Sequence, residues 1–451
     1  MSLFGSARDL RYRLGDWRRY ERQIDQLHSR YLYTSYLYSF EQDGVCLASV
    51  ILDKARFAKL LARTVARGEY RFAPGRVRTI QVDGKERVVY SFRLTDLILH
   101  RVVAEIVEEA AAPHLSSCLY SYRPGVSWWQ PIAGFAAYAR RHRQERPDPR
   151  SRGLYVLRRD IQSYTDSIPV EPDSPLWPML RRLLAADRRD GEISPSDWQV
   201  IEEVVRPTVF VEPGRYFQMC RGVPTGQPIS CVLFNYYLAA FDRELDSIPG
   251  AFYARYSDDL LFAHPDAEVV KEVATQIDVA LAALRLQAHP DKGEELYLTA
   301  AGRHSADWPA AKGSPHATFL GCRVSAQGAI SLRQKKVRAF LAVVKQRARQ
   351  TMAAMEGASP ERIGRAVCSV VNQVIAPRNN VFEQRSATLL RRAVTDRQQL
   401  KQLDYLVALA VAATLSHRRG ARAFRAVPYR KLRQEWALES LYHARNRWAR
   451  R

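Results

Sequence analysis

The sequence has no apolar run long enough to cross a bilayer and no apolar core of the kind that begins a secreted protein. A membrane-spanning helix needs about 20 apolar residues, and the best candidate, residues 403–415, is shorter and is interrupted by Asp404. We expect that segment to be a buried core helix. The first residues contain no signal-peptide core, so we expect neither secretion nor insertion into a membrane.

Paired cysteines and histidine ligand patterns are also missing. The six cysteines are scattered without a Cys-x-x-Cys pair, and the ten histidines show no His-Glu-x-x-His spacing. A zinc module or a disulfide framework would need such spacings. Their absence argues against both classes and is typical of a chain kept in the reducing cytoplasm.

Acidic residues are scarce in the last part of the chain. Residues 330–451 hold 26 lysines and arginines against 7 aspartates and glutamates, within a chain whose formal net charge is +22. A strongly basic segment joined to a nearly neutral body indicates a polyanion that is bound mainly from one side. Nucleic acid is the expected polyanion, and a membrane surface is the competing one. With 451 residues, 47% of them hydrophobic, the chain is long enough for two or three packed domains.

Residues 251–263 contain a polar centre, Ser257-Asp258-Asp259, between two runs of aromatic and small apolar residues. This pattern predicts a β-hairpin. Two ionised carboxylates beside a core are costly unless a cation compensates them, and Mg²⁺ is commonly held by one or two carboxylates and substrate phosphates. An ordinary turn, in which aspartate is frequent, is the alternative.

Residues 256–259 resemble the Tyr-x-Asp-Asp box of reverse transcriptases, and other stretches resemble further boxes of that family in the family's order. Asp160, at the end of a predicted strand, matches the aspartate of the Asp-Ile-x-x-x-x-x-x-Ile box. Residues 221–230 resemble the Gly-x-Pro-Gln-Gly-x-x-x-Ser box. Residues 286–292 are similar to the Leu-x-Leu-Asn-x-x-Lys stretch, and residues 319–321 to the Phe-Leu-Gly primer grip.

Two features precede these boxes. Residues 116–125 resemble the Ser-Tyr-Gly-Phe-Arg-Pro-Gly stretch of bacterial and group II intron reverse transcriptases, with Ser121 in place of the usual glycine. Residues 76–89 alternate around Asp83-Gly84, which predicts a hairpin with basic arms. Polymerase fingers resemble such a hairpin, whose cations offset the charge of the incoming triphosphate. Charged edge strands that discourage pairing are the alternative.

The resemblance implies an α+β right-hand polymerase, in which fingers and a palm, an antiparallel sheet packed on helices, are followed by an all-α thumb. The expected divisions are an N-terminal helical extension over 1–75, fingers over 76–153, a palm over 154–330 with a fingers insertion near 170–215, and a basic helical thumb over 331–451. In the first 40 residues, arginines at helical spacing predict a charged helix face. We favour solvation of that face over contact with nucleic acid.

The same resemblance implies a two-metal reaction. Two Mg²⁺ ions, for which Mn²⁺ is an alternative, would activate the primer hydroxyl and stabilise the leaving pyrophosphate. Lys292 would protonate the pyrophosphate or offset its charge; a solvated surface lysine is the alternative. The implied metal ligands are Asp160, Asp258, Asp259 and the carbonyl of Ile161. The implied nucleotide-binding residues are Lys85, Arg87, Tyr164, Thr165, Gly226 and Gln227. The implied template or primer contacts are Arg123, Tyr256, Phe319, Gly321, Lys335 and Arg338.

Two positions depart from the family pattern. Thr165 stands where reverse transcriptases usually carry the phenylalanine or tyrosine that blocks a ribose 2′-hydroxyl. Either Tyr164 blocks the hydroxyl instead, or discrimination against ribonucleotides is weaker. Thr225 stands where the Pro-Gln-Gly box has glutamine, which alters the expected contact with template or sugar.

The predicted function is RNA-directed DNA polymerisation, with an RNA template, deoxynucleoside triphosphates and a DNA product. A compact thumb without an endonuclease, together with the Pro-Thr-Gly box, is most similar to defence-associated bacterial reverse transcriptases. These work in the bacterial cytoplasm with a dedicated noncoding RNA against phage. The alternatives are a retron or group II intron-derived enzyme, a template-independent or protein-primed DNA polymerase, and an RNA-binding scaffold with a vestigial palm. A partner protein or a homo-oligomer is left open.

Overall fold

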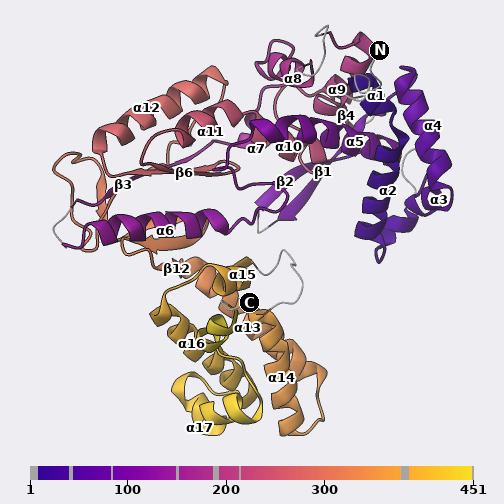
Figure 1. Ribbon diagram of the computed structural model, residues 1–451. Coiled ribbons are helices and arrows are strands. Elements are labelled where there is room, and N and C mark those ends of the chain that lie inside the picture. Colours follow the sequence, from indigo (N-terminus) through magenta and orange to yellow (C-terminus); the bar gives the residue numbers. More distant parts are fainter. Residues whose placement is uncertain are drawn as a thin grey trace.

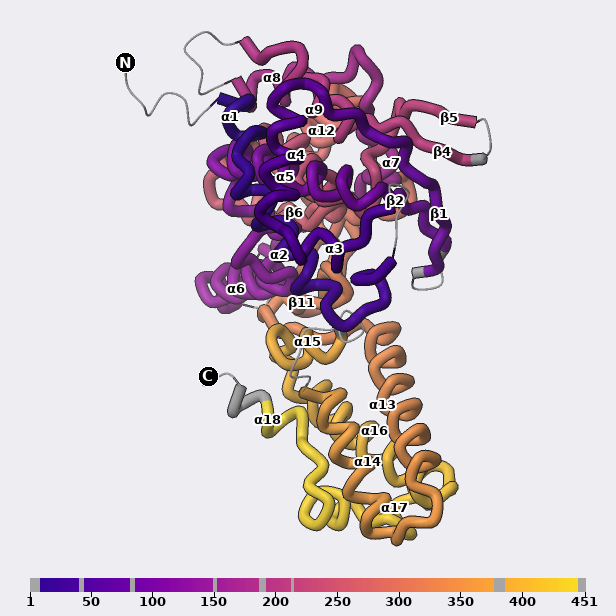
Figure 2. Tube along the Cα trace, turned by 90° about the vertical axis from the view of Figure 1, so that its right-hand side faces the viewer, coloured from indigo at the N-terminus to yellow at the C-terminus, as the bar shows by residue number. Residues whose placement is uncertain are grey.

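The computed structural model of the protein describes residues 9–39, 44–82, 85–148, 152–185, 192–212, 215–376 and 385–448. It is an α+β structure in which a helical thumb projects from a larger part made of helices and sheets (Figures 1 and 2). Within these residues, no helix is both long enough and apolar enough to span a membrane.

The palm is a five-stranded sheet in the order β6-β7-β3-β8-β9. β3 (Leu154–Asp160) lies at its centre and pairs antiparallel with β7 (Asp259–His264) and β8 (Glu294–Leu298). β6 (Phe252–Tyr256) forms a hairpin with β7, and β9 (Lys312–Ser314) adds a parallel edge. The predicted strand and the predicted hairpin are both confirmed.

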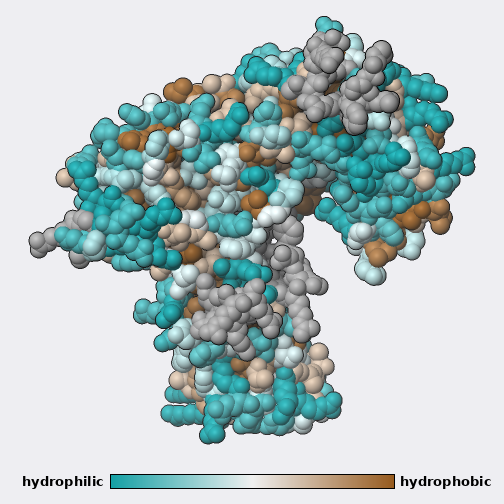
Figure 3. Space-filling view, in the orientation of Figure 1, coloured by the Kyte–Doolittle hydropathy of each residue, from teal (hydrophilic) through white to brown (hydrophobic). Residues whose placement is uncertain are grey.

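Two hydrophobic cores cover the opposite faces of this sheet, because successive strand residues point to opposite sides. Tyr155 and Leu157 of β3 belong to one core, and Leu154 and Val156 belong to the other. The first core includes α11 (Ala239–Asp246) and α12 (Ala267–Ala283), whereas the second includes α6 (Gln130–Glu145) and the thumb. Hydrophilic side chains cover the outer face of α6 (Figure 3).

The fingers sheet combines two distant segments of the chain, in the order β2-β1-β4-β5. β1 (Gly75–Val82) and β2 (Lys85–Ser91) form the predicted antiparallel pair, whose Asp83-Gly84 turn lies outside the described residues. β4 (Thr208–Glu212) pairs parallel with β1 and antiparallel with β5 (Arg215–Gln218).

The N-terminal helices pack on α5 (Leu94–Ala111) and share its core. Arg13 and Arg19 each bind Glu109 at 2.8 Å, and Arg19 also binds Glu105 at 2.7 Å. The expectation of a solvated arginine face is therefore wrong for Arg13 and Arg19, which join α2 and its neighbour to α5. The helices of this part are α1 (Leu10–Gly15), α2 (Trp17–Tyr31), α3 (Leu47–Leu52) and α4 (Lys54–Ala66).

A small three-stranded sheet connects the palm to the thumb, and α13, α14 and α16 pack together beyond it. The predicted buried segment 403–415 lies within α16, where Leu403, Val407 and Val411 are buried. The bounds are β10 (His316–Phe319), β11 (Cys322–Ser325), β12 (Ile330–Leu332), α13 (Gln334–Ala354), α14 (Pro360–Ile375), α15 (Arg385–Arg392), α16 (Arg397–Ser416), α17 (Ala423–Ala426) and α18 (Leu441–Trp448). The remaining helices are α7 (Tyr164–Ser167), α8 (Leu176–Ala185), α9 (Pro195–Val205) and α10 (Pro228–Tyr236).

Candidate active site

Asp160 and the tip of the β6–β7 hairpin meet at one end of the palm sheet. Asp160 is directly opposite Asp259 in the β3–β7 pairing, and Asp259 is opposite Tyr256 within the hairpin. The backbone N–H of Ile161 donates to the carbonyl of Asp258 at 2.9 Å. Carboxylates from two distant parts of the sequence are thus brought together, as the resemblance implies.

The Asp259 carboxylate is held by Arg158, which lies on the neighbouring strand. Arg158 Nε and Nη2 donate to its two oxygens at 2.9 and 3.3 Å. Burial still raises the pKa of Asp259 to about 6, because desolvation outweighs the attraction of Arg158 and the nearby carboxylates add repulsion. Both oxygens of Asp259 accept from Arg158, so Asp259 is less available to a metal ion than Asp160 or Asp258.

Lys292 reaches the site from the segment that follows α12. Its Nζ donates to Oδ1 of Asp160 at 2.7 Å. The backbone holds this segment in place, since the N–H of His289 donates to the carbonyl of Asp160 at 2.7 Å. The Lys292 side chain is 50% exposed, so this ion pair adds little stability. The ammonium therefore lies at the acidic site and can still be reached from solvent.

Asp258 differs from both neighbours, because no side chain forms a hydrogen bond or ion pair with its carboxylate among the described residues. Burial raises its pKa, and the charge of Asp160 raises it further, while Lys292 and Arg87 act in the opposite direction. A divalent cation between Asp160 and Asp258 would offset this desolvation and repulsion.

The acidic residues therefore suit a divalent cation without forming a closed metal site. In the part of the chain that the structure describes, no three acidic, histidine or cysteine side chains are close enough to hold a metal ion. Asp160 and Asp258 are the fitting pair, with the Ile161 carbonyl following directly in the chain. Asp259 fits as their support, since Arg158 occupies its oxygens.

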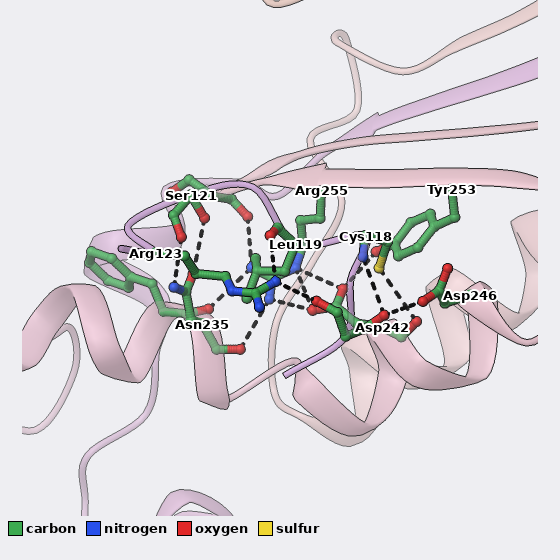
Figure 4. A network of polar contacts seen from close by, with 12 residues as sticks. Cys118, Leu119, Ser121, Arg123, Asn235, Asp242, Asp246, Tyr253 and Arg255 are labelled. Atoms are coloured by element: carbon green, nitrogen blue, oxygen red, sulfur yellow. Dashed lines mark hydrogen bonds and ion pairs between the residues drawn. The ribbon is translucent and has the colours of Figure 1, made fainter. Parts of the chain in front are cut away.

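Beneath the hairpin turn, a fully buried ion pair joins Arg255 to Asp242 of α11 (Figure 4). The guanidinium also donates to the carbonyls of Phe234, Asn235 and Ser257, at 3.2, 3.0 and 3.2 Å. Ser257 has φ 58, a left-handed conformation that is uncommon for a residue other than glycine. Arg255 therefore anchors the backbone of the turn that carries the acidic pair.

The Arg-Pro-Gly segment is attached to β6 beside this network. The N–H of Tyr120 donates to the carbonyl of Arg255, and the N–H of Arg255 donates to the carbonyl of Cys118, both at 3.0 Å. Ser121 and Asn235 exchange two hydrogen bonds of 2.9 and 2.8 Å (Figure 4). Ser121 is fully buried, so the residue that replaces the usual glycine has a structural role here.

Arg123 was expected to contact template or primer. Its Nη1 donates to the carbonyls of Ser116 and Leu119 at 2.8 and 3.1 Å (Figure 4). Arg123 therefore helps to fold its own loop, and its contact with template or primer stays a prediction.

Tyr164 and Thr165 were the two candidates for contact with the sugar of the nucleotide. Tyr164 is buried, and its hydroxyl donates to the carbonyl of Phe234 at 2.7 Å. That placement contradicts the alternative in which Tyr164 blocks a 2′-hydroxyl. Thr165 is partly exposed, and its carbonyl accepts from the N–H of Val223 at 3.0 Å, which leaves Thr165 next to the glycine-containing box.

Gly226 and Gln227, the two predicted nucleotide contacts of that box, face different surroundings. Gly226 has φ 95, and a Cβ built on it would meet no atom within 4 Å, so its backbone is open to approach. Gln227 is buried, and its Nε2 donates to the carbonyl of Tyr90 at 3.1 Å while its Oε1 contacts His100 Nδ1 at 3.3 Å. The Gln227 side chain thus ties α5 to the fingers, contrary to the prediction that it binds nucleotide.

The fingers hairpin presents its basic residues on one face. Cross-strand partners point to the same side, and the pairs Arg78↔Val89 and Ile80↔Arg87 therefore put both arginines together. Arg87 is exposed, and its charge acts to lower the pKa of Asp258 against the larger effect of burial. Its contact with the nucleotide stays a prediction. The side chain of Lys85 lies outside the described residues.

The remaining predicted contacts with template or primer differ in how far their side chains are exposed. Phe319 is fully buried in the core, which contradicts a direct contact of its side chain, and Gly321 beside it has φ 84. Lys335 and Arg338 are exposed on the first turns of α13. Tyr256 is partly exposed at the end of β6, with its ring 6.5 Å from that of Tyr122.

Sequence reasoning missed Arg158, which binds the Asp259 carboxylate, and the pair of Arg255 and Asp242, which anchors the hairpin turn. Arg158 could have been identified from the sequence, because a charged residue inside an otherwise apolar strand needs a buried partner. The same is true of Arg255 inside the hairpin. Asp242 could not have been identified, since nothing in a helical pattern tells which strand residue lies opposite.

The chain matches the family model described as "Reverse transcriptase (RNA-dependent DNA polymerase)" over residues 82–324. This match covers more than half of the chain and includes every one of the acidic residues above. The chain belongs to the reverse transcriptase family.

Similar proteins include the Retrovirus-related Pol polyprotein from type-1 retrotransposable element R2 of Nasonia vitripennis. It is 27% identical over 159 residues, which are 34% of this chain and 15% of that polyprotein. Similar solved structures include telomerase from Candida albicans in complex with a TWJ fragment of telomeric RNA, with a TM-score of 0.44 and 12% identity over 88% of this chain and 70% of that one. Apo telomerase from Candida tropicalis has a TM-score of 0.43 and 12% identity over 81% and 68%.

Proposed function

We propose that the protein is an RNA-directed DNA polymerase that copies an RNA template from deoxynucleoside triphosphates. The observation that carries this proposal is the meeting of Asp160 and Asp258, in a chain of the reverse transcriptase family, opposite the cations Lys292 and Arg87. Paired carboxylates that face cations suit a reaction in which phosphate charge is bound and transferred.

In the mechanism we propose, each residue has one task. Divalent ions, Mg²⁺ or Mn²⁺, would activate the primer hydroxyl and offset the charge on the leaving pyrophosphate. Asp160 and Asp258 would hold them, and Arg158 keeps the Asp259 carboxylate oriented beside this pair. Lys292 leaves Asp160 to meet the leaving pyrophosphate, where its ammonium offsets charge or donates a proton. Arg87 binds the triphosphate from the fingers.

We also propose how the enzyme selects between deoxynucleotides and ribonucleotides. Tyr164 is held in the core by Phe234, so the remaining candidate is Thr165, whose backbone carbonyl lies beside Gly222 and accepts from the N–H of Val223. Threonine is smaller than an aromatic ring. We therefore propose that the enzyme prefers deoxynucleotides less strongly than a reverse transcriptase with an aromatic residue there.

Within the family, we propose a bacterial, defence-associated enzyme that works in the cytoplasm with a dedicated noncoding RNA. The supporting features are the Pro-Thr-Gly sequence at 224–226 and a thumb of helices alone within the described residues. All six cysteines are free, in keeping with a reducing compartment. A retron or group II intron-derived enzyme is the alternative within the family, and both readings allow a partner protein or a homo-oligomer.

The test uses protein purified from its host with bound RNA retained, supplied with Mg²⁺ and labelled nucleotides singly and in mixtures. Free labelled DNA complementary to one copurified RNA is the expected product. Label that stays on the polypeptide after denaturation would point to protein priming, and DNA without a matching RNA would point to template-independent synthesis. No incorporation at all, with folded protein and bound RNA, would support an RNA-binding scaffold and overturn the proposal.

A further inference from the structure

A groove of about 620 Å³ runs along the thumb between α13 and α16. The two helices lie side by side (Figures 1 and 2). They also run in the same direction, because the side chain of Gln399, near the start of α16, forms hydrogen bonds of 2.7 and 2.9 Å with the backbone of Leu332, just before α13. Matching turns of both helices therefore border the groove.

The length of the groove follows from these turns. On α13 its lining extends from Leu341 to Met352, and on α16 it extends from Leu406 to His417, just after the last turn. At about 1.5 Å per residue, the groove is about 16 Å long, which is about three helical turns.

The floor of the groove is apolar. Leu341, Met352, Leu406 and Leu409 line it and are half-buried, so each keeps some surface exposed to solvent. A dry cavity of about 150 Å³ accepts one benzene, so a groove of about 620 Å³ can take about four side chains of that size. Covering this surface with apolar side chains would be favourable.

The rim of the groove is cationic. Lys345 and Arg349 of α13 line it together with Arg418 and Arg419, which follow α16, and all four are exposed. Among the described residues, no acidic side chain lines the groove and none forms an ion pair with these four cations. Cations gathered around one groove attract negative charge. The complementary occupant is therefore acidic as well as apolar.

These two properties together favour a protein segment over a nucleic acid. A phosphate backbone is bound by cations and gains nothing from an apolar floor. Single strands are commonly held by aromatic side chains on which their bases stack, and no aromatic residue is among the described residues that line the groove. A flat bilayer surface would not reach a floor that lies between two helices.

We propose that this groove binds an amphipathic helix of an acidic partner protein. Such a helix places apolar side chains at positions i, i+3, i+4 and i+7 on one face. These four anchors match both the volume of the groove and its length of about three turns. Aspartates and glutamates on either side of the apolar stripe would pair with the four cations of the rim.

The groove is distinct from the acidic site and from the predicted duplex contacts. Lys335 and Arg338 precede it on α13 and do not line it. The proposal therefore does not depend on the polymerase function. The formal net charge of +22 would also speed association with an acidic partner.

The experiment uses a labelled synthetic peptide of about three to four helical turns, with leucines at the spacing above and glutamates at the other positions. A second peptide has the same composition, but its leucines are spread around the helix. Fluorescence anisotropy with the full-length protein is expected to show the amphipathic peptide binding about tenfold or more tightly. Both peptides carry the same charge, so only the apolar floor distinguishes them.

Two variants and their matched controls locate the binding. Lys345→Glu with Arg349→Glu is expected to weaken binding of the amphipathic peptide about tenfold or more, whereas Arg347→Glu, at an exposed position of α13 outside the groove, should have a much smaller effect. Ala413→Phe, which fills the floor without changing the charge, should weaken it similarly. Ala354→Phe, an exposed position outside the groove, should not.

The same variants separate the partner helix from other occupants. Ala413→Phe should leave the affinity for an RNA–DNA duplex unchanged; an equal loss for duplex and peptide would assign the groove to nucleic acid. Concentration-dependent self-association that the peptide reverses would assign it to a second copy of the chain. Either result, equal binding of the two peptides, or no saturable binding would overturn the proposal. If Ala413→Phe does not fold, the two peptides and the charge variants still decide.

Discussion

Arg255 is the residue that most directly sets the geometry of the acidic site. Ser257 adopts a left-handed backbone at a cost of about 1–2 kcal/mol, and its carbonyl is held by the guanidinium of Arg255. Arginine alone has enough donors to serve Asp242 and three carbonyls at once. The position of Asp258 therefore depends on a side chain that touches no substrate.

The effect of Arg255 on the position of Asp258 can be separated from its effect on the stability of the fold. Asp242→Leu alone leaves Arg255 charged and unpaired in the core, and we expect a loss of about 3–5 kcal/mol in the free energy of unfolding in urea. The double variant Arg255→Met with Asp242→Leu should recover most of that loss, because no buried charge remains. We still expect its polymerase rate to fall about tenfold or more, since the Ser257 carbonyl has lost its donor. A double variant with wild-type stability and a wild-type rate would contradict this role.

His100 predicts how stability changes in acid. Its folded pKa of about 4 lies below the ordinary value of 6.5, so the unfolded chain takes up a proton before the folded one does. Because His100 is buried in its neutral form, about 3 kcal/mol of the free energy of unfolding depends on it. This contribution is fully present above about pH 6.5 and is lost as the pH falls toward 4. Urea unfolding of the wild type and of His100→Leu at pH 7 and pH 5 should show a smaller loss in the variant. An equal loss in both proteins would contradict the assignment.

At the scale of elements, the fingers hairpin brings cations to the acidic site. Arg87 is on the face that also carries Arg78, whereas its chain neighbour Glu86 points to the opposite face. The charge of Arg87 acts to lower the pKa of Asp258, which burial and Asp160 raise.

We expect Arg87→Gln to raise the KM for deoxynucleotides about tenfold, with a smaller change in kcat, because a cation that binds the triphosphate is lost. Glu86→Gln, an equally exposed position on the other face, is the matched control and should change neither constant. Steady-state primer extension gives both values. An unchanged KM in Arg87→Gln would place the triphosphate elsewhere.

Elements were predicted from the sequence where a local pattern decides them. Alternation around the Asp-Gly turn predicted the fingers hairpin, and the apolar runs on either side of Ser257-Asp258-Asp259 predicted the β6–β7 hairpin. The apolar run that ends at Asp160 predicted the central strand. Helix ends are less predictable: Ser91 and Thr95 are residue types that favour a cap near the start of α5, yet the cap is Arg93, without a side-chain hydrogen bond. Such ends depend on long-range packing rather than on nearby residues.

Residues of the acidic site were likewise predicted where a local motif decides their position, and not where tertiary contacts do. Asp160, Asp258 and Lys292 were found from motifs and come together as expected. Gln227 and Phe319 were assigned to ligands, but tertiary contacts had already used or buried them. A motif gives the position of a residue in the chain, whereas the direction of its side chain is set by distant partners.

In the whole molecule, one of the two hydrophobic cores joins the basic thumb to the palm. The core on one face of the palm continues into the thumb, so the basic thumb is fixed to the sheet that carries the acidic residues. Its first helix, α13, presents Lys335 and Arg338 to solvent directly after the small connecting sheet. We propose that a duplex held by the thumb contacts these two cations.

The affinity for an RNA–DNA duplex should therefore fall steeply with salt. If both cations contact phosphates, Lys335→Gln with Arg338→Gln should reduce the slope of log K against log salt by about 2. Arg243→Gln is the control, because α11 belongs to the core on the other face of the palm. Fluorescence anisotropy between about 50 and 200 mM salt measures the slope. The same slope in the double variant as in the wild type would remove these two residues from the interface.

We propose that Asp160 and Asp258 form the centre of an RNA-directed DNA polymerase. The most direct measurement is primer extension on a defined RNA template with Mg²⁺ and deoxynucleotides, comparing the wild type with Asp258→Asn. Asp266→Asn is a matched control, because Asp266 caps α12 through its side chain and lies outside the acidic site. We expect DNA from the wild type and from the control, and a rate at least about a thousandfold lower from Asp258→Asn, since a metal ligand has been lost. Equal rates from Asp258→Asn and the wild type would contradict the account.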